Sequence, residues 1–248
     1  MEDIRRMFVT GSDCCNSFQT DRRCRRCTPA IRRRWALLLC LAVLSAGQSG
    51  CSLFVMAGKM IYGDPKIASK FKLGTGMDLA KDDKTVLVVC SIPESVRNEF
   101  PSIEFDLIDG TIRRLKRRGI QVVNPDDVAS WIDDNGGYWE EPDELAEHFN
   151  ADVIIHVDLN RFSYKEENSP SMYRGRAEGT IYGYEVRKVG DEKRVREVFV
   201  REFIPVYPAN SPIPVEVPVR VFQKRFLDHV TTQITQMLAD HRISELIK

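Results

Sequence analysis

The sequence predicts an α/β (α+β) domain with a mixed sheet of about five strands, in the element order β-α-β-α-β-β-β-α. A continuous apolar run at residues 85–90 is typical of a buried central strand. Two alternating segments at residues 174–186 and 195–206, joined by a charged turn, indicate an antiparallel hairpin. A long amphipathic C-terminal helix is indicated by apolar side chains at every fourth position: Phe222, Phe226, Val230, Ile234 and Leu238.

The first strand continues into a βαβ unit. Pro101 and Ser102 open the predicted helix, and Gly119 is suited to end it in the left-handed conformation. Residues 120–123 supply the second strand, so the crossover between the two strands should be right-handed. The helix is expected to bury its apolar positions: Phe105, Ile108, Ile112 and Leu115.

The remaining elements lie between this unit and the hairpin. A short helix is expected around residues 128–132, and another at residues 141–149 with Pro142 in its first turn. Residues 152–159 predict a third strand, which is long enough to continue to Tyr164.

Charge and composition divide the chain into three parts. Residues 1–50 hold nine Arg and four acidic residues, whereas the rest of the chain holds 27 basic and 32 acidic residues. This acidic excess argues against nucleic-acid binding, which depends on clustered Lys and Arg. We expect a basic leader and signal peptide at residues 1–50 (apolar segment 35–46), a tether at residues 51–83 and a single α/β domain at residues 84–248.

The cysteines follow the same division. Six of the seven lie in the first 51 residues, so the predicted domain has no disulfide framework. Cys24 and Cys27 form a C-x-x-C pair, for which a metal knuckle is one interpretation and an unusually long leader, or a start codon placed too early, is the other. Cys90 lies in the predicted central strand, where we expect an inert apolar thiol.

The apolar segment after Arg32, Arg33 and Arg34 has the layout of a secretory signal. Its twelve residues, WALLLCLAVLSA, are too few to span about 30 Å of hydrocarbon. The following QSGC resembles a bacterial lipobox, with Gln48 standing where the pattern usually has Leu. The resemblance implies lipid attachment at Cys51 and a domain that faces the periplasm or the exterior. An uncleaved signal anchor and ordinary cleavage nearby stay open as alternatives.

The element order, together with the segments RRGIQVVNPDDV and ADVIIHVDL, is similar to that of a group of bacterial envelope domains. The group comprises the N-terminal domain of the Tol translocation protein, the lipoprotein activators of penicillin-binding proteins and the periplasmic domain of the curli secretion lipoprotein. The similarity covers about residues 84–247 and concerns architecture. It implies a binding or assembly domain without chemistry of its own.

An aromatic loop is the first candidate site. Two glycines precede Tyr138 and Trp139, and Trp131 lies a few residues upstream. Exposed aromatic loops often recognise partners, so we predict that these three residues bind one. The alternative is that the two Trp side chains fold back over the sheet.

A second candidate site lies on the third strand. Asp152, His156 and Asp158 share one face at a period of two, and such a set could hold a metal ion or act as acid and base. The alternative is that Asp152 caps the strand and that His156 is a satisfied polar residue.

The sequence therefore predicts a membrane-anchored envelope lipoprotein whose extracytoplasmic domain binds or helps to assemble other envelope proteins. No nucleophile, Gly-rich or cofactor motif accompanies the domain, so we predict no catalytic residue and no cofactor. The expected partners are membrane lipid, through acylated Cys51, and other envelope proteins. A metal-dependent enzyme centred on His156 and Asp158 is the alternative from another class. A third hypothesis is a homo-oligomer, as a subunit of a secretion ring.

Overall fold

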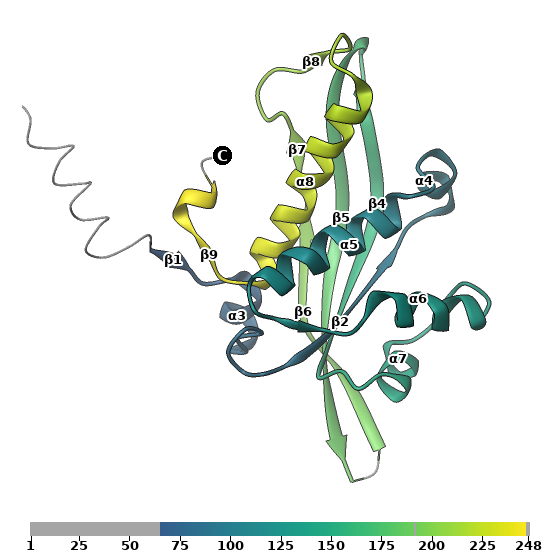
Figure 1. The fold of residues 1–248 in the computed structure, drawn as a ribbon, viewed down its shortest axis with the longest axis vertical. Coiled ribbons are helices and arrows are strands. Elements are labelled where there is room, and N and C mark those ends of the chain that lie inside the picture. Colours follow the sequence, from purple (N-terminus) through teal and green to yellow (C-terminus); the bar gives the residue numbers. More distant parts are fainter. Residues whose placement is uncertain (1–64, 191, 247–248) are drawn as a thin grey trace, which may run out of the picture. The chain divides into compact units, whose positions relative to one another are not determined.

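A mixed sheet forms the centre of the computed structural model, which describes residues 65–190 and 192–246 (Figure 1). Its main strands, in spatial order, are β3 (Gln121–Val122), β2 (Thr85–Ser91), β4 (Val153–Glu166), β5 (Ser169–Val189) and β6 (Glu192–Phe203). The strand β2 pairs in parallel with β3 and β4, and the other neighbours are antiparallel. Two short strands, β7 (Val206–Tyr207) and β8 (Ile213–Pro214), add to β5. The predicted fold class is confirmed.

Two groups of helices cover the two faces of this sheet. One face packs against α3 (Lys70–Thr75), α5 (Ile103–Arg117) and α8 (Val219–Leu238). The other packs against α6 (Pro125–Asp134) and α7 (Pro142–His148). Successive side chains of a strand point to opposite faces. The side chains of β2 enter the two cores in alternation: Val86, Val88 and Cys90 the first, and Leu87 and Val89 the second.

Helix α8 confirms the pattern of apolar residues at every fourth position. All five predicted side chains are buried, and they lie on the stripe that faces the sheet and α5. Aromatic rings dominate this contact, since the ring of Phe226 lies 5.1 Å from that of Phe162 and Tyr173 stacks on Phe222 at 5.1 Å. Gly175 of β5 leaves the space that the Phe226 ring fills.

Helix α5 confirms part of its predicted buried face. Ile112 and Leu115 are buried as predicted, but Phe105 is 65% exposed, and the buried stripe also includes Ile103 and Leu107. The small residue Gly110 lies on this stripe because α8 approaches there: a Cβ atom at Gly110 would lie 2.8 Å from Cγ2 of Thr231. The prediction was wrong at Phe105 because the stripe that faces α8 runs through Leu107 and Gly110, and Gly110 contributes no large apolar side chain to the pattern.

The second core is smaller and covers only part of its face. Asn124 caps the N-terminus of helix α6, because its side chain accepts a hydrogen bond from the backbone N–H of Asp126. Val128 of α6 and Leu145 of α7 pack over Ile154 of β4. Beyond Ile154 the same face of β4 carries half-buried polar side chains, so this face of the sheet is partly open.

The folded unit begins earlier than residue 84. Strand β1 (Lys66–Ile67) pairs with β9 (His241–Arg242), which continues into the 3-10 helix η1 (Ile243–Leu246). Phe71 of α3 is fully buried in the first core, and Leu79 is 3% exposed. Residues 65–83 therefore pack with the domain. The prediction that they belong to a tether was wrong. Their glycines suggested a linker, but the buried side chains between them contribute to the core. A short helix that we did not predict, α4 (Glu94–Glu99), follows β2.

Several predictions lie outside the described residues. They concern the basic leader, the signal peptide, the Cys24 and Cys27 pair, lipid attachment at Cys51 and the tether as far as residue 64. Within residues 65–190 and 192–246, no helix has the length and apolar content that crossing a membrane requires.

Candidate partner-binding site

The loop between α6 and α7 presents the predicted aromatic residues. Gly136 and Gly137 have φ angles of 88° and 84°, which residues with a side chain rarely adopt. These two residues reverse the chain after α6 and direct Tyr138 and Trp139 along the domain surface. Asn135 supports the turn, because its side-chain amide donates a hydrogen bond of 2.7 Å to the carbonyl oxygen of Trp131.

Trp131 is anchored on α6 and half-buried. Its ring centroid lies 5.5 Å from that of His148 and 6.0 Å from that of Phe149. Phe149 is buried in the second core, so one edge of Trp131 is fixed by packing. An aromatic side chain held in this way loses little conformational entropy when it binds a partner.

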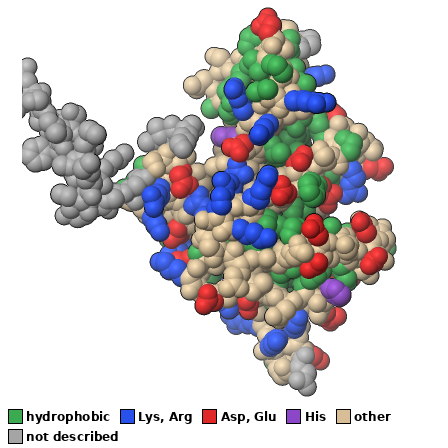
Figure 2. Space-filling model, in the orientation of Figure 1, with side chains coloured by type: hydrophobic (Ala, Val, Ile, Leu, Met, Phe, Trp, Pro, Cys, Tyr) green, Lys and Arg blue, Asp and Glu red, His purple; other side chains and the backbone are tan. Residues whose placement is uncertain are grey.

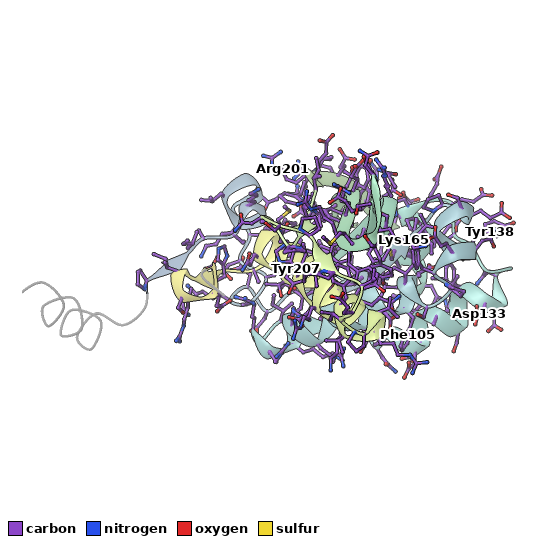
Figure 3. The ribbon with its side chains drawn as sticks, turned by 90° about the horizontal axis from the view of Figure 1, so that it is seen from above. Phe105, Asp133, Tyr138, Lys165, Arg201 and Tyr207 are labelled. Atoms are coloured by element: carbon purple, nitrogen blue, oxygen red, sulfur yellow. The ribbon has the colours of Figure 1, made fainter. Side chains whose placement is uncertain are left out.

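Trp139 and Tyr138 point in different directions. Trp139 is half-buried and packs edge-on against His156 of β4, with ring centroids 4.8 Å apart. Tyr138 is 63% exposed, and Figure 3 shows it at the outer edge of the domain, near Asp133. Both Trp side chains therefore pack against the domain, whereas Tyr138 is exposed and accessible to a partner.

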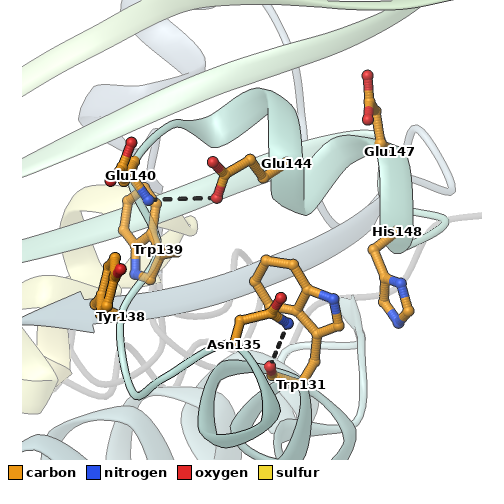
Figure 4. A pocket seen from close by; sticks show the side chains of 8 residues that line it. All are labelled: Trp131, Asn135, Tyr138, Trp139, Glu140, Glu144, Glu147 and His148. Carbon is orange, nitrogen blue, oxygen red and sulfur yellow. Dashed lines mark hydrogen bonds between the residues drawn. The ribbon is translucent and has the colours of Figure 1, made fainter.

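These three aromatic residues line one cavity of about 680 Å³ (Figure 4). The other lining residues are polar: Asn135, Glu140, Glu144, Glu147 and His148. Glu144 accepts a hydrogen bond of 3.3 Å from the backbone N–H of Glu140, which connects the loop to α7. The aromatic residues were predicted from the sequence, but the glutamates were not, although Glu144 and Glu147 lie three residues apart on α7.

The cavity lies in a strongly acidic part of the domain, which we call the acidic lobe (residues 124–148). The lobe contains no Lys or Arg. Its nine acidic side chains are all exposed: Asp126, Asp127, Asp133, Asp134, Glu140, Glu141, Asp143, Glu144 and Glu147. An aromatic cavity with carboxylates around it attracts Lys and Arg side chains, both by charge and by contact of a cation with a ring face.

Asp152 and His156, from the second candidate site, have structural partners. The Asp152 carboxylate accepts a hydrogen bond of 2.9 Å from the backbone N–H of Thr85 and lies 3.9 Å from Nζ of Lys84. His156 Nε2 is hydrogen-bonded to Oγ of Ser91 at 2.9 Å, and its ring stacks on Tyr182. Burial lowers the pKa of His156, with Asp158 opposing the shift, so the neutral imidazole is favoured.

The metal alternative is not supported by this geometry. Among the residues that the structure describes, no group of three or more His, Cys, Asp or Glu side chains could hold a metal ion. Asp152, His156 and Asp158 are thus not assembled as a ligand set, because Asp152 precedes β4 and its carboxylate binds the backbone N–H of Thr85 at the start of β2. Cys90 is a free, buried thiol, and burial raises its pKa, so the reactive thiolate is disfavoured as predicted.

No protein family model matches the chain, and no curated protein matches it. Solved structures of similar fold include a PelC dodecamer from Paraburkholderia phytofirmans, with 10% identity over 71% of this chain and 96% of that one and a TM-score of 0.39. They also include protein XCC0632 from Xanthomonas campestris, with 15% identity over 62% and 82% and a TM-score of 0.39. Lipoprotein GNA1162 from Neisseria meningitidis has 13% identity over 61% and 97% and a TM-score of 0.36. Similarities this distant carry no argument about what the present chain does.

Proposed function

We propose that this chain is a lipid-anchored protein of the cell envelope whose domain binds other envelope proteins through the acidic lobe. The observation that carries the proposal is the cavity around Trp131, Tyr138 and Trp139 with its three glutamates. The lining of this cavity contains no Ser, Thr, Cys or Lys side chain, and the described residues contain no ligand set for a metal ion. Recognition of a partner is the function that these side chains support best.

The arrangement resembles the centre of a protein interface. Buried aromatic side chains often contribute most of the binding free energy, provided that the partner excludes water from them. Here the two Trp residues are held in place by the second core, and Tyr138 is exposed beside them. The surrounding carboxylates favour a partner segment with Lys or Arg side chains.

Cross-linking in membranes tests this function. A photoreactive phenylalanine analogue is introduced at Ser130, an exposed residue of α6 in the acidic lobe. The full chain should then form cross-linked products on illumination. Tyr138→Ala should lower their yield about tenfold or more, since loss of a central interface aromatic weakens binding by 2 kcal/mol or more.

The control is Phe105→Ala, because Phe105 is as exposed as Tyr138 but lies on α5. Its cross-linking yield should equal that of the unsubstituted chain. Equal yields for the Tyr138→Ala and Phe105→Ala variants would show that the aromatic cavity does not bind the partner.

Anchoring through Cys51 completes the proposal. In this proposal the lipid is attached to Cys51, as the lipobox resemblance implies, and the domain starts about fourteen residues later at Pro65. A connection of this length reaches at most about 50 Å, since an extended chain spans about 3.5 Å per residue. Cys51→Ala should abolish labelling with a radioactive fatty acid and release the protein from membranes, whereas Cys40→Ala should change neither. Labelling that survives Cys51→Ala would disprove the anchor.

A further inference from the structure

A basic groove lies between α5 and α8, on the side of the sheet opposite the acidic lobe. It has a volume of about 1320 Å³. Its basic lining residues are Arg114, Arg117, Arg118, Arg220, Lys224 and Arg225. Figure 2 shows Lys and Arg side chains gathered where Figure 1 places α5 and α8, and Asp and Glu side chains over α6.

Most of these cations have no acidic partner. Arg114 pairs with Asp228, and Arg118 pairs with Glu245 at 2.6 Å. The other four are exposed, and within the described part of the chain none of them forms an ion pair: Arg117, Arg220, Lys224 and Arg225. Four cations in one groove repel one another, so an anionic occupant would lower the free energy of this surface.

The acidic lobe shows the complementary property. None of its nine carboxylates forms an ion pair with any Lys or Arg of residues 65–190 and 192–246. Carboxylates elsewhere in the domain commonly do, as Glu166 does with Arg174 and Arg176. The chain therefore carries two unpaired surfaces of opposite sign.

These two surfaces cannot pair within one molecule. Helices α6 and α7 pack on the face of β2 that carries Leu87 and Val89, whereas α5 and α8 pack on the face that carries Val86 and Val88. The sheet thus stands between the lobe and the groove. Only a second molecule can bring an acidic lobe to this basic groove.

We propose that the basic groove binds the acidic lobe of a second copy of this chain, in a head-to-tail contact. The inference rests on the proposed function and deepens it, because it adds a second copy of this chain to the envelope proteins that the acidic lobe binds. Apolar contacts would accompany the charges, since Tyr138 is 63% exposed on the lobe and Val221 is 41% exposed in the groove, which Tyr207 also lines. A contact between two different surfaces repeats from copy to copy, so it builds a ring or a filament.

The photoreactive group at Ser130 of the full chain provides the test. We expect a product with the mass of two copies, in which the cross-linked peptide of the second copy comes from α5 or α8. Arg117→Glu together with Arg225→Glu should lower its yield about tenfold or more, because like charges at a contact oppose binding. Adding Glu144→Arg and Glu147→Arg to the same chain should restore the product.

The matched control carries Lys165→Glu and Lys188→Glu, which change the net charge equally at exposed sites outside the groove. Its yield should not fall. Products with other proteins alone, or with other segments of a second copy, would overturn this inference and leave the proposed function standing. An absence of every product would overturn both.

Discussion

The two faces of the sheet differ in how completely they are covered. The face under α5 and α8 is closed by Phe and Leu side chains, and its core extends along β4 from Val153 to Phe162. The face under α6 and α7 is closed only as far as Ile154. Beyond that point it carries half-buried polar and aromatic side chains such as His156 and Tyr182.

This difference indicates that the two faces have different roles, one in stability and one in binding. Burial of large apolar side chains is the main source of folding free energy, so the first face should determine stability. The second face contributes less burial and positions the aromatic cavity. Substitutions on the two faces should therefore have separable effects.

Phe226→Ala should have the largest effect on stability. Phe226 is fully buried against Phe162 and fills the space above Gly175. Removing its ring leaves a cavity, and we expect the free energy of unfolding to fall by about 3–5 kcal/mol, as measured by urea denaturation. Phe105→Ala is the control and should change it by less than about 0.5 kcal/mol. Similar losses for both variants would contradict the buried face described for α5.

Gly110→Ala should have an intermediate effect. The added methyl group would lie 2.8 Å from Cγ2 of Thr231, which forces α5 and α8 apart. Overpacking of this kind costs about 1–3 kcal/mol, and the better helix propensity of Ala offsets up to about 1 kcal/mol of it. We therefore expect a net loss of about 1 kcal/mol in urea denaturation.

Thr231→Ser provides the second half of that test. Serine lacks Cγ2 but keeps the hydroxyl group that donates to the carbonyl oxygen of Leu227. In the double variant with Gly110→Ala, most of the lost stability should return. No recovery would mean that Thr231 is not the group that opposes a side chain at position 110.

The smallest effect concerns pH and tests the open face. Because burial lowers the pKa of folded His156 below its value in the unfolded chain, the unfolded state takes up its proton first as the pH falls. The contribution of His156 to stability is therefore complete above pH about 6.5 and is lost as the pH falls through the folded pKa.

His156→Gln should remove this part of the pH dependence. The measurement is the free energy of unfolding of both chains between pH about 4 and 8, a range that includes the ordinary pKa of His. His229 also has a pKa lowered by burial, and it contributes equally to both chains. Parallel curves for the two chains would show that His156 is not desolvated by Trp139 and Tyr182.

The sequence was most informative where one large side chain recurs at a fixed interval. The buried stripe of α8 and the antiparallel pair of β5 and β6 follow from such patterns. It was misleading where small residues form the contact, as at Gly110, and where Phe71 and Leu79 are separated by glycines. Packing partners that lie far apart in the chain decide these positions, and a local pattern does not contain them.

The candidate site was predicted in part. Trp131, Tyr138 and Trp139 were singled out because aromatic residues next to a Gly-Gly turn are conspicuous in the sequence, and the structure places all three around one cavity. The basic groove was not foreseen, since its cations come from α5 and α8, about one hundred residues apart. The acidic lobe could have been predicted from the forty-two residues between Gly119 and Asn160, which contain no Lys or Arg.

The pairing of β2 with β4 has a consequence for the order of folding. Val86 of β2 pairs with Val153 of β4, so these two strands pair only when distant parts of the chain meet. The strands β5 and β6, in contrast, are joined by a short turn. Local pairs close faster than distant ones, because less chain entropy is lost in bringing them together. We expect the hairpin to form early and the insertion of β2 to be slow. The aromatic cavity, which rests on Leu87 and Val89 of that strand through the second core, should be among the last parts to form.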